Sequence, residues 1–582
     1  MLHRTYPDIA VVADAHFHDL FGDYDFAGVD DPRGQMSVRP LADTARSTRV
    51  FNESCFALRH TLDDIAERNI HHVVLLGDYS DDGQKATVGA VARLLQDYAE
   101  RHGMQFYATV GNHDIFAEAG RHRSKRFLNQ RGGHTLVTSN PERQDPQADA
   151  VIVTDKMFCP GYPDGLLALK DFGFFRRPHY RHWETPFGSD DDPAARLYDV
   201  GSQDRQTVRR LMDCSYLVEP FDGVWLLMID ANVFVPDDSA EDGFTDSTSA
   251  GWNGMLTSKR FVLDWIADVA RRAEAQGKHL LAFSHYPALD PLDGTVSDER
   301  DVLGDTSLSL RIPAPDVATA LIEAGLKLHF SGHLHINDTA RFRQGEAFLM
   351  NISVPSLVAF PAGYKIVGFY GDRLRIETVS IDAMALDAGI LAAYRSEVAA
   401  TGKAHGEMLA ARTYAGFLDA HIAHLVGRRH LRREWPKDLA ALVQVLSLEE
   451  VAVLALLPEL ADAHAALAAA RAGKADPIIA ARLSDLTAAA GLAQNLLPAM
   501  SAMRFLQDWY RLRMGSELAL AYIPAANLAA YRLLETLYAG KEAGTGVRAR
   551  FARLLRMYRQ YRSGLPSADF TIDLATGDIA AI

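Results

Sequence analysis

Short apolar runs alternate with amphipathic stretches through the first part of the chain. Most runs hold β-branched residues and are flanked by Gly, Asp, His or Pro. This rhythm is typical of β-strands that alternate with helices, so it predicts an α/β fold. The predicted strands are Ile9–Ala13, Val73–Leu76, Phe106–Val110, Val224–Ile229, Leu280–Phe283, Leu326–Phe330, Phe348–Val354 and Lys365–Phe369.

The segment between Asn112 and Tyr216 interrupts this rhythm. It is rich in Arg, His, Asp, Pro and aromatic residues, as in the stretch from Asp171 to Glu184. Because structureless loops of such length are uncommon in compact domains, we expect an insertion over about residues 116–213. A cap or rim beside a site and a surface excursion without a ligand role are equally compatible with its composition.

The pattern changes near Ile381. From there to about Arg562 the chain is rich in Ala, Leu, Arg and Glu, with apolar residues at helical spacing. We therefore predict an α/β domain over residues 1–382 and an α-helical C-terminal domain over residues 383–582. The helical domain is expected to pack on the first domain or to form a homo-oligomer contact.

Bulk composition excludes some classes of partner. The chain has 582 residues, 48% of them hydrophobic, and a net charge of -15, so it has no overall attraction for nucleic acid or anionic membranes. Its longest apolar stretch, Val451 to Leu467, contains charged residues and is too short to span a bilayer. The 3 cysteines are too few and too dispersed for a disulfide framework, which fits a reducing, cytoplasmic location.

Metal-binding residue types follow several of the predicted strands. Two residues of one strand end that are two positions apart point to the same side, as Asp14 and His16 do. Open α/β sheets form their sites where the strands end. The blocks are Asp14-Ala-His16, Gly77-Asp78-Tyr-Ser-Asp81-Asp82-Gly83, Gly111-Asn112-His113-Asp114, His285 and Gly332-His333-Leu-His335. One block alone is a weak signal, because a single Asp or His at a strand end is usually a turn residue.

In order and spacing these blocks resemble the calcineurin-like metallophosphoesterases, over roughly Pro7 to Ile381. The family pattern is D-x-H, G-D-x-x-D-x-G, G-N-H-D/E, a lone His, and G-H-x-H. The resemblance implies a four-layer sandwich of two β-sheets flanked by helices. It also implies two metal ions: one held by Asp14, His16, Asp78 and His335, the other by Asp78, Asn112, His285 and His333.

The resemblance implies a reaction as well. Two cations about 4 Å apart would clamp a phosphoric ester, and a hydroxide bridging them would attack phosphorus in line. His113 would protonate the leaving alkoxide or stabilise charge on the phosphoryl group, and Asp114 would orient its imidazole. Nitrogen and oxygen ligands without thiolate suit Mn, Fe, Zn or Co, and the sequence does not separate these ions.

The expected substrate is a small-molecule phosphoester, with a phosphodiester preferred because cyclic-nucleotide and glycerophosphodiester phosphodiesterases also pair D-x-H with G-N-H-D. The alternatives are a phosphomonoesterase or nucleotidase, and a non-catalytic scaffold that acts through the helical domain. Asp82 stands where protein serine/threonine phosphatases carry Arg, which weighs against that branch. Arg46 and Arg49 are candidate phosphate contacts, although a surface ion pair is the more common role for each.

Three features are weighed against plainer roles. His18 continues the alternation of His16 but is left out of the site, because a local hydrogen bond explains it equally well. The basic runs from Gly427 to Glu434 and from Arg548 to Arg562 fit solvated helix faces or acidic neighbours better than an anionic partner. We therefore do not expect nucleic acid or a membrane as a partner.

Overall fold

A computed structural model describes residues 4–245, 250–402 and 405–582. The chain divides into two compact units, of which unit 1 comprises residues 1–291, 311–420 and 568–582, and unit 2 comprises residues 292–310 and 421–567. The expected domains, 1–382 and 383–582, stay a prediction. Three segments differ from that division: residues 292–310 join the helical unit, and residues 383–420 and 568–582 join unit 1.

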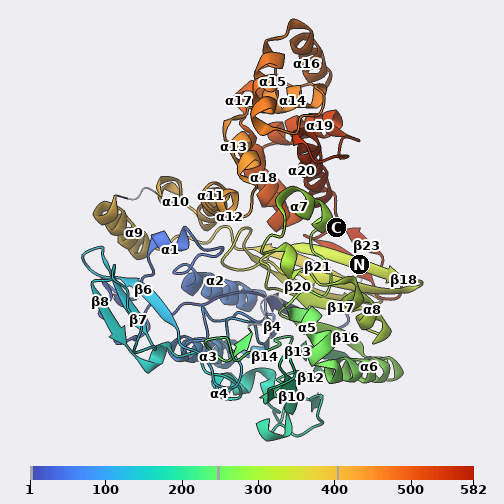
Figure 1. Cartoon of the computed structure of the whole chain (residues 1–582). Coiled ribbons are helices and arrows are strands. Elements are labelled where there is room, and N and C mark those ends of the chain that lie inside the picture. Colours follow the sequence, from blue (N-terminus) through green and yellow to red (C-terminus); the bar gives the residue numbers. More distant parts are fainter. Residues whose placement is uncertain (1–3, 246–249, 403–404) are drawn as a thin grey trace. The chain divides into compact units, whose positions relative to one another are not determined.

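Unit 1 is built on two seven-stranded sheets (Figure 1). The first has the order β23(Ile579–Ala581), β22(Phe570–Asp573), β21(Arg373–Ser380), β20(Gly363–Tyr370), β1(Ile9–Val12), β4(His72–Leu76), β5(Gln105–Thr109). The second has the order β18(Asp338–Gln344), β19(Ala347–Ser353), β17(Leu328–Ser331), β16(His279–Ser284), β13(Val224–Ile229), β12(Tyr216–Phe221), β9(His182–Glu184). The predicted fold class is confirmed, although β22 and β23 were expected to be helical sequence.

The two sheets contact each other through β5 of the first sheet and β12 and β13 of the second. Tyr216 in β12 donates a hydrogen bond from its hydroxyl to the carbonyl of Ala108 in β5 at 2.9 Å. Thr109 at the end of β5 donates to the carbonyl of Ile229 in β13 at 3.0 Å. Every residue of β1, β4 and β13 is buried, as expected for strands covered on both faces, which explains why they read as continuous apolar runs.

Helices cover the outer faces. Those beside the first sheet include α2(Ser54–Glu67) and α3(Lys85–His102), and those packed on the second are α5(Gly251–Ser258), α6(Arg260–Ala275) and α8(Pro315–Glu323) (Figure 1). In α6 the buried side chains recur at helical spacing, from Val262 and Ile266 to Val269 and Ala273, so one stripe faces the sheet. Helix α3 ends at Gly103, whose φ of 65° is the left-handed conformation that closes many helices.

The expected insertion is structured. It contains a three-stranded sheet of β6(Ser124–Leu128), β7(His134–Thr138) and β8(Ala150–Val153), and a hairpin of β10(Leu197–Gly201) and β11(Val208–Met212). The other helices and strands of unit 1 are α1(Leu41–Thr44), α4(Asp164–Leu167), α9(Ala388–Thr401), α10(Gly406–Ala410), β2(Val29–Asp31), β3(Gly34–Met36), β14(Val235–Pro236) and β15(Phe244–Thr245). Helix α11(Tyr414–Leu425) runs from unit 1 into unit 2.

Unit 2 is helical. It comprises α7(Val296–Leu303), α12(Leu431–Arg433), α13(Lys437–Val445), α14(Leu448–Leu456), α15(Ala463–Ala475), α16(Pro477–Ala489), α17(Leu496–Ala499), α18(Ala502–Gly515), α19(Ala525–Tyr538) and α20(Val547–Arg562). Local sequence sets where its helices begin: Ser447 and Glu450 form a capping box at the start of α14. Asp476 caps α16, with Pro477 at the first helical position.

Helix α7 belongs to unit 2, although in sequence it lies between β16 and β17 of unit 1. Its Glu299 is fully buried and pairs with Arg513 of α18, whose Nε donates to Oε2 at 3.0 Å. The arginines of α20 are also paired: Arg550 with Asp438 at 2.7 Å and Arg562 with Glu535 at 2.8 Å. Acidic neighbours therefore account for much of the basic run in α20.

The remaining features of the composition are the cysteines and the apolar helices. Cys55, Cys159 and Cys214 are buried free thiols. Among the described helices, none is both long enough and apolar enough to span a membrane.

Candidate metal centre

The topology brings the polar blocks to one edge of each sheet. Strands β1, β4 and β5 are parallel neighbours, so Asp14, Asp78 and Asn112 follow the ends of three adjacent strands. In the second sheet β16 and β17 are parallel, and His285 and His333 follow their ends. Since carboxyl ends of parallel strands share one edge, local sequence and topology together place these side chains near one another.

Asp14, His16 and His335 form one group of converging ligand atoms. The Nε2 atoms of His16 and His335 are 3.1 Å apart. Asp14 Oδ1 lies 3.5 Å from Nε2 of His335 and 3.9 Å from Nε2 of His16. All three residues are buried, and their donor atoms lie within 4.8 Å of one another, which is close enough for one cation to reach all of them.

Asp78 connects this group to a second one. Its Oδ2 lies 3.6 Å from Nε2 of His16 and 3.3 Å from Nε2 of His285. His285 Nε2 in turn lies 3.2 Å from Nδ1 of His333. The carboxylate of Asp78 thus stands between the two groups, where the expected bridging ligand would be. The ligand atoms of Asp14, Asp78 and His285 also lie within 4.8 Å of one another.

Asn112 is the remaining expected ligand. It is buried, and its Oδ1 accepts no hydrogen bond from any described residue. A buried amide oxygen without a partner carries a desolvation cost, and a cation would remove that cost. The structure therefore brings all seven expected side chains to the carboxyl edges of the sheets, while their assignment as metal ligands stays a prediction.

The backbone at these residues is strained. Five of the seven have a positive φ: Asp14 (48°), His16 (39°), Asp78 (48°), His333 (72°) and His335 (56°). Few residues other than glycine adopt this conformation, and when they do it often marks a functional site. Glycines provide the necessary space, because a Cβ on Gly111 would lie 2.1 Å from Asp78 Oδ1 and one on Gly332 would lie 2.4 Å from Asp14 Oδ2.

Hydrogen bonds from neighbouring groups hold the ligands in place. The amide of His333 donates to Asp14 Oδ2 at 2.9 Å, and the hydroxyl of Ser356 donates to the carbonyl of Asp14 at 2.8 Å. The amide of His113 donates to Asp78 Oδ1 at 2.8 Å. His285 Nδ1 contacts the carbonyl of Leu76 at 2.9 Å, which directs its Nε2 toward Asp78.

The electrostatics of the donor set fit a cation. Burial lowers the pKa of His16 and His333 well below the usual value, so both imidazoles are neutral and able to bind metal. Burial opposes ionisation of Asp78, yet the adjacent imidazoles, His285 foremost, hold its pKa well below the usual value. Burial likewise opposes protonation of His285, but Asp78 raises its pKa to about 9, so a metal would displace a proton from this imidazole. Imidazole nitrogens that converge with carboxylate oxygens are a donor set for a divalent metal.

His113 contacts a different carboxylate from the one expected. Its Nδ1 is hydrogen-bonded to Oδ1 of Asp82. Asp114 instead accepts hydrogen bonds from the amide of Ser80 at 3.0 Å and the amide of Gly111 at 2.9 Å. Asp114 therefore braces the two strand-end loops, and the expected orienting contact to His113 is not formed. Its direct attachment to both loops explains why it turns away from the imidazole.

Four cationic side chains, Arg39, Arg49, Arg123 and Lys125, surround Asp81 and Asp82; they are called the basic cluster below. Arg49 Nη2 lies 3.4 Å from Nδ1 of His113, and its Nη1 lies 3.5 Å from Nε2, so the guanidinium lies against the ring. Burial and then Arg49 lower the pKa of His113 to about 3. The imidazole is therefore neutral at pH 7 in the absence of a bound anion.

Sequence reasoning found part of this cluster. Of the two candidate arginines, Arg46 is exposed and Arg49 lies at His113. Arg123 and Lys125 were missed, although they stand two positions apart at β6 and so share one face, which is a signal for a common contact. His18 makes a local hydrogen bond, from its Nε2 to the carbonyl of Ser37 at 2.6 Å.

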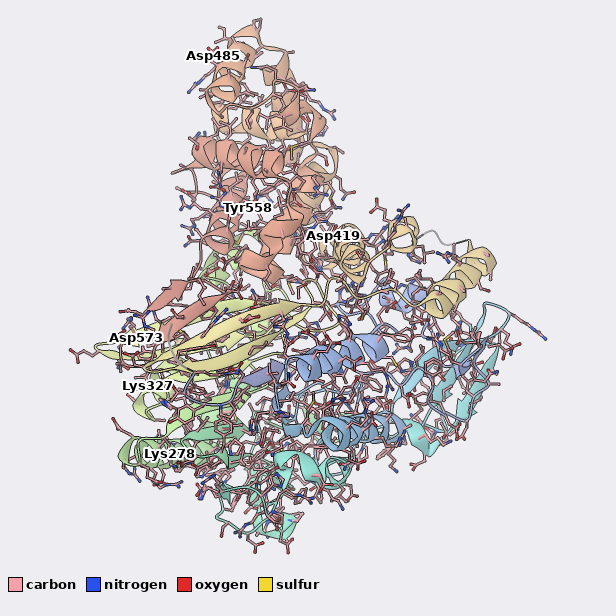
Figure 2. All side chains as sticks on the ribbon, turned by 180° about the vertical axis from the view of Figure 1, so that it is seen from behind. Lys278, Lys327, Asp419, Asp485, Tyr558 and Asp573 are labelled. Atoms are coloured by element: carbon pink, nitrogen blue, oxygen red, sulfur yellow. The ribbon has the colours of Figure 1, made fainter. Side chains whose placement is uncertain are left out.

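A cavity elsewhere in unit 1 has no part in this centre. It has a volume of about 740 Å³ and is lined by Lys278, Lys327, Phe369 and Leu574, among others. Figure 2 labels Lys278 and Lys327 on this part of the unit. None of the seven expected ligands lines it.

One family model covers the first three of the five polar blocks. The model of the calcineurin-like phosphoesterase family matches residues 7–185. A dimetal phosphatase from Danio rerio is similar in structure, with 14% identity over 64% of this chain and 96% of that chain and a TM-score of 0.33, a likeness too low to support a conclusion. No curated protein matches the sequence. The match thus covers Asp14, His16, Asp78 and Asn112, while His285, His333 and His335 lie beyond it.

Proposed function

We propose that this protein hydrolyses phosphoric esters with the help of two metal ions, and that phosphodiesters are its preferred substrates. The observation that carries the proposal is the position of Asp78 Oδ2, between Nε2 of His16 at 3.6 Å and Nε2 of His285 at 3.3 Å, with His113 beside them. Two ligand groups that share one carboxylate are the arrangement needed to hold two cations close together.

The bound metal ions would supply Lewis acidity and an activated water. Asp14, His16 and His335 would hold one of them, and Asn112, His285 and His333 the other, with Asp78 shared. The strained backbone and the hydrogen bonds to Asp14 and Asp78 keep these donors in place before a metal binds, which reduces the ordering that binding requires.

His113 would act on the departing oxygen of the ester. It is neutral in the absence of a substrate, but a bound phosphate anion stabilises the protonated imidazole. Asp82 at Nδ1 fixes the ring orientation and directs Nε2 toward the reaction. Proton donation to the leaving oxygen matters most for poor leaving groups, because these depart slowly as alkoxides.

Phosphomonoester or nucleotide hydrolysis is the second candidate. The observation in its favour is the basic cluster, because guanidinium groups bind a dianionic phosphate more strongly than a monoanionic one. The preference for diesters rests on the sequence pattern that pairs D-x-H with G-N-H-D.

Turnover of bis(p-nitrophenyl) phosphate and p-nitrophenyl phosphate by protein loaded with Mn, Zn or Fe tests the proposal. We expect diester hydrolysis to exceed monoester hydrolysis, and Asp78→Asn to abolish both. Asp155→Asn is the control, because Asp155 is an exposed partner of Lys85. Faster monoester turnover would favour the second candidate. Loss of all turnover across a broad ester panel would favour the scaffold alternative.

A further inference from the structure

The basic cluster carries more positive charge than its own carboxylates balance. Within the described residues, these four cationic groups pair with two carboxylates, Asp81 and Asp82, so cationic groups outnumber acidic ones in the cluster. The side chains are largely withdrawn from solvent, with exposures of 7% for Arg39, 11% for Arg49, 17% for Arg123 and 8% for Lys125. Because buried charge is unfavourable without compensation, this surplus favours an anion.

Several donors in the cluster are free to bind one. Nε of Arg39, Nε of Arg49 and Nη2 of Arg123 are buried and have no hydrogen-bond partner among the described residues. Nη2 of Arg123 lies 3.5 Å from Oδ1 of Asp82. A phosphate or carboxylate group would satisfy such donors, since guanidinium groups bind these anions through paired hydrogen bonds.

The location of the cluster relative to His113 indicates which part of a substrate it would bind. The rings of His113 and His16 are 5.0 Å apart, which places His113 at the edge of the metal centre. Arg49 lies against His113, and Arg123 and Lys125 reach Asp82, the partner of that imidazole. If His113 acts on the leaving oxygen, the cluster lies beside the leaving group.

We propose that the basic cluster, through Arg49 and Arg123, binds a second anionic group, a phosphate or a carboxylate, carried by the leaving group of the substrate. This inference rests on the proposed hydrolysis of phosphoesters and narrows its substrate class. Lys125 accords with it, because burial, together with Arg39 and Arg49, outweighs Asp81 and lowers the pKa of Lys125 to about 7, and an added anion would restore its charge.

The insertion would thereby contribute to specificity. Arg123 precedes β6 and Lys125 lies within it, so both come from the inserted three-stranded sheet rather than from the two large sheets. Arg39 and Arg49 come from the segment between β1 and α2. Two separate excursions from the sandwich therefore meet at His113.

Two matched diesters test this inference: methyl 4-carboxyphenyl phosphate and the compound in which the carboxylate is a methyl ester. Their leaving groups differ only in one negative charge, and the ester has the more acidic phenol, so intrinsic reactivity favours the uncharged substrate. We expect the wild-type protein to show a kcat/KM about tenfold higher for the carboxylate, the contribution of about one charge-assisted hydrogen bond.

Arg123→Gln and Arg49→Gln should remove this preference. Arg126→Gln is the control. Arg126 lies in β6 next to Lys125, but its side chain points to the opposite face and pairs with Asp145 at 2.8 Å. A wild-type protein without the preference, or a preference that survives both variants, would overturn the inference. An equal loss for both diesters would also overturn it, since the cluster would then bind the scissile phosphate.

A binding measurement separates failure of this inference from failure of the proposed function. Inorganic phosphate should raise the Tm of chelator-treated wild-type protein and of Arg126→Gln, but not of Arg123→Gln. If neither diester is hydrolysed while this pattern holds, the proposed function fails and the anion site is supported. If phosphate does not raise the Tm of the wild-type protein, the anion site itself is refuted.

Discussion

Asp82 Oδ1 accepts a hydrogen bond from Nδ1 of His113, in a chain where the neighbouring Asp114 was the expected partner. The contact links a residue of the second sequence block to one of the third. Because a carboxylate at Nδ1 fixes both the tautomer and the orientation of an imidazole, Asp82 is a positioning residue for His113.

Asp82→Asn should therefore slow turnover by roughly 10- to 100-fold with poor leaving groups and much less with p-nitrophenolate. The amide preserves the size of the side chain but favours the wrong tautomer of His113. Asp114→Asn is the comparison, because Asp114 bonds to Ser80 and Gly111 rather than to the imidazole. The dependence of kcat on leaving-group pKa separates the two variants. An unchanged dependence in Asp82→Asn would show that Asp82 does not position His113.

His113→Ala should retain both metal ions while losing roughly 10²- to 10⁴-fold in turnover with alkyl leaving groups, the usual contribution of a general acid. No ligand atom of the candidate centre comes from its imidazole, although its amide donates to Asp78 Oδ1 at 2.8 Å, and alanine keeps that amide. Metal content by elemental analysis and kcat for alkyl esters provide the check. Full turnover of alkyl esters by this variant would remove His113 from the mechanism.

Glu53 predicts a pH-dependent stability. Burial raises the pKa of this carboxyl from 4.5 to about 7, and its Oε1 accepts a hydrogen bond from the hydroxyl of Tyr394 at 3.0 Å. Below pH 4.5 both the folded and the unfolded chain are protonated here. As the pH rises to about 7, only the unfolded chain ionises freely, so the folded state loses about 3 kcal/mol of relative stability.

Glu53→Gln should consequently be more stable than the wild-type protein at pH 8, and the difference should vanish near pH 4.5. Urea unfolding at both pH values measures this difference. Glu67→Gln is the matched control, because Glu67 ends the same helix and is exposed. A pH-independent difference for the Glu53 variant would show that its carboxyl does not titrate with a raised pKa.

Glu299→Gln should destabilise unit 2 by roughly 3–5 kcal/mol, because it leaves the guanidinium of Arg513 buried without a counter-charge. Calorimetric unfolding of the whole chain should show the transition of the helical unit at a lower temperature. Glu323→Gln, at the exposed end of α8 in unit 1, is the control. An unshifted transition would argue against residues 292–310 as a structural part of unit 2.

The sequence predicts the sandwich well because buried parallel strands appear in it as uninterrupted apolar runs, such as Val73–Leu76 and Val224–Ile229. It predicts the convergence of Asp14, Asp78, Asn112, His285 and His333 because strand ends of parallel sheets share an edge. It does not predict β22 and β23, since strands as short as Phe570–Asp573 and Ile579–Ala581 carry little periodicity.

Contacts between residues far apart in sequence could not be predicted from local sequence patterns. The choice between Asp82 and Asp114 as the partner of His113 depends on how the loops after β4 and β5 pack, which adjacency in sequence does not specify. Likewise Lys125 reaches Asp81 at 3.1 Å from an inserted strand, and Glu299 reaches Arg513 across a long stretch of chain. Such pairings are set by tertiary structure, and the residue types alone fit a solvated surface equally well.

Asp78 is proposed to join two groups of side chains into a centre for two metal ions. Elemental analysis of metal-loaded, extensively dialysed protein tests it most directly, with Asp78→Asn and the exposed-site control Asp155→Asn measured in parallel. Two divalent ions per chain are expected in the wild-type protein and in the control, with impaired retention of both ions in Asp78→Asn. Wild-type protein that retains no metal, or Asp78→Asn protein that retains two ions as firmly as wild type, would contradict it.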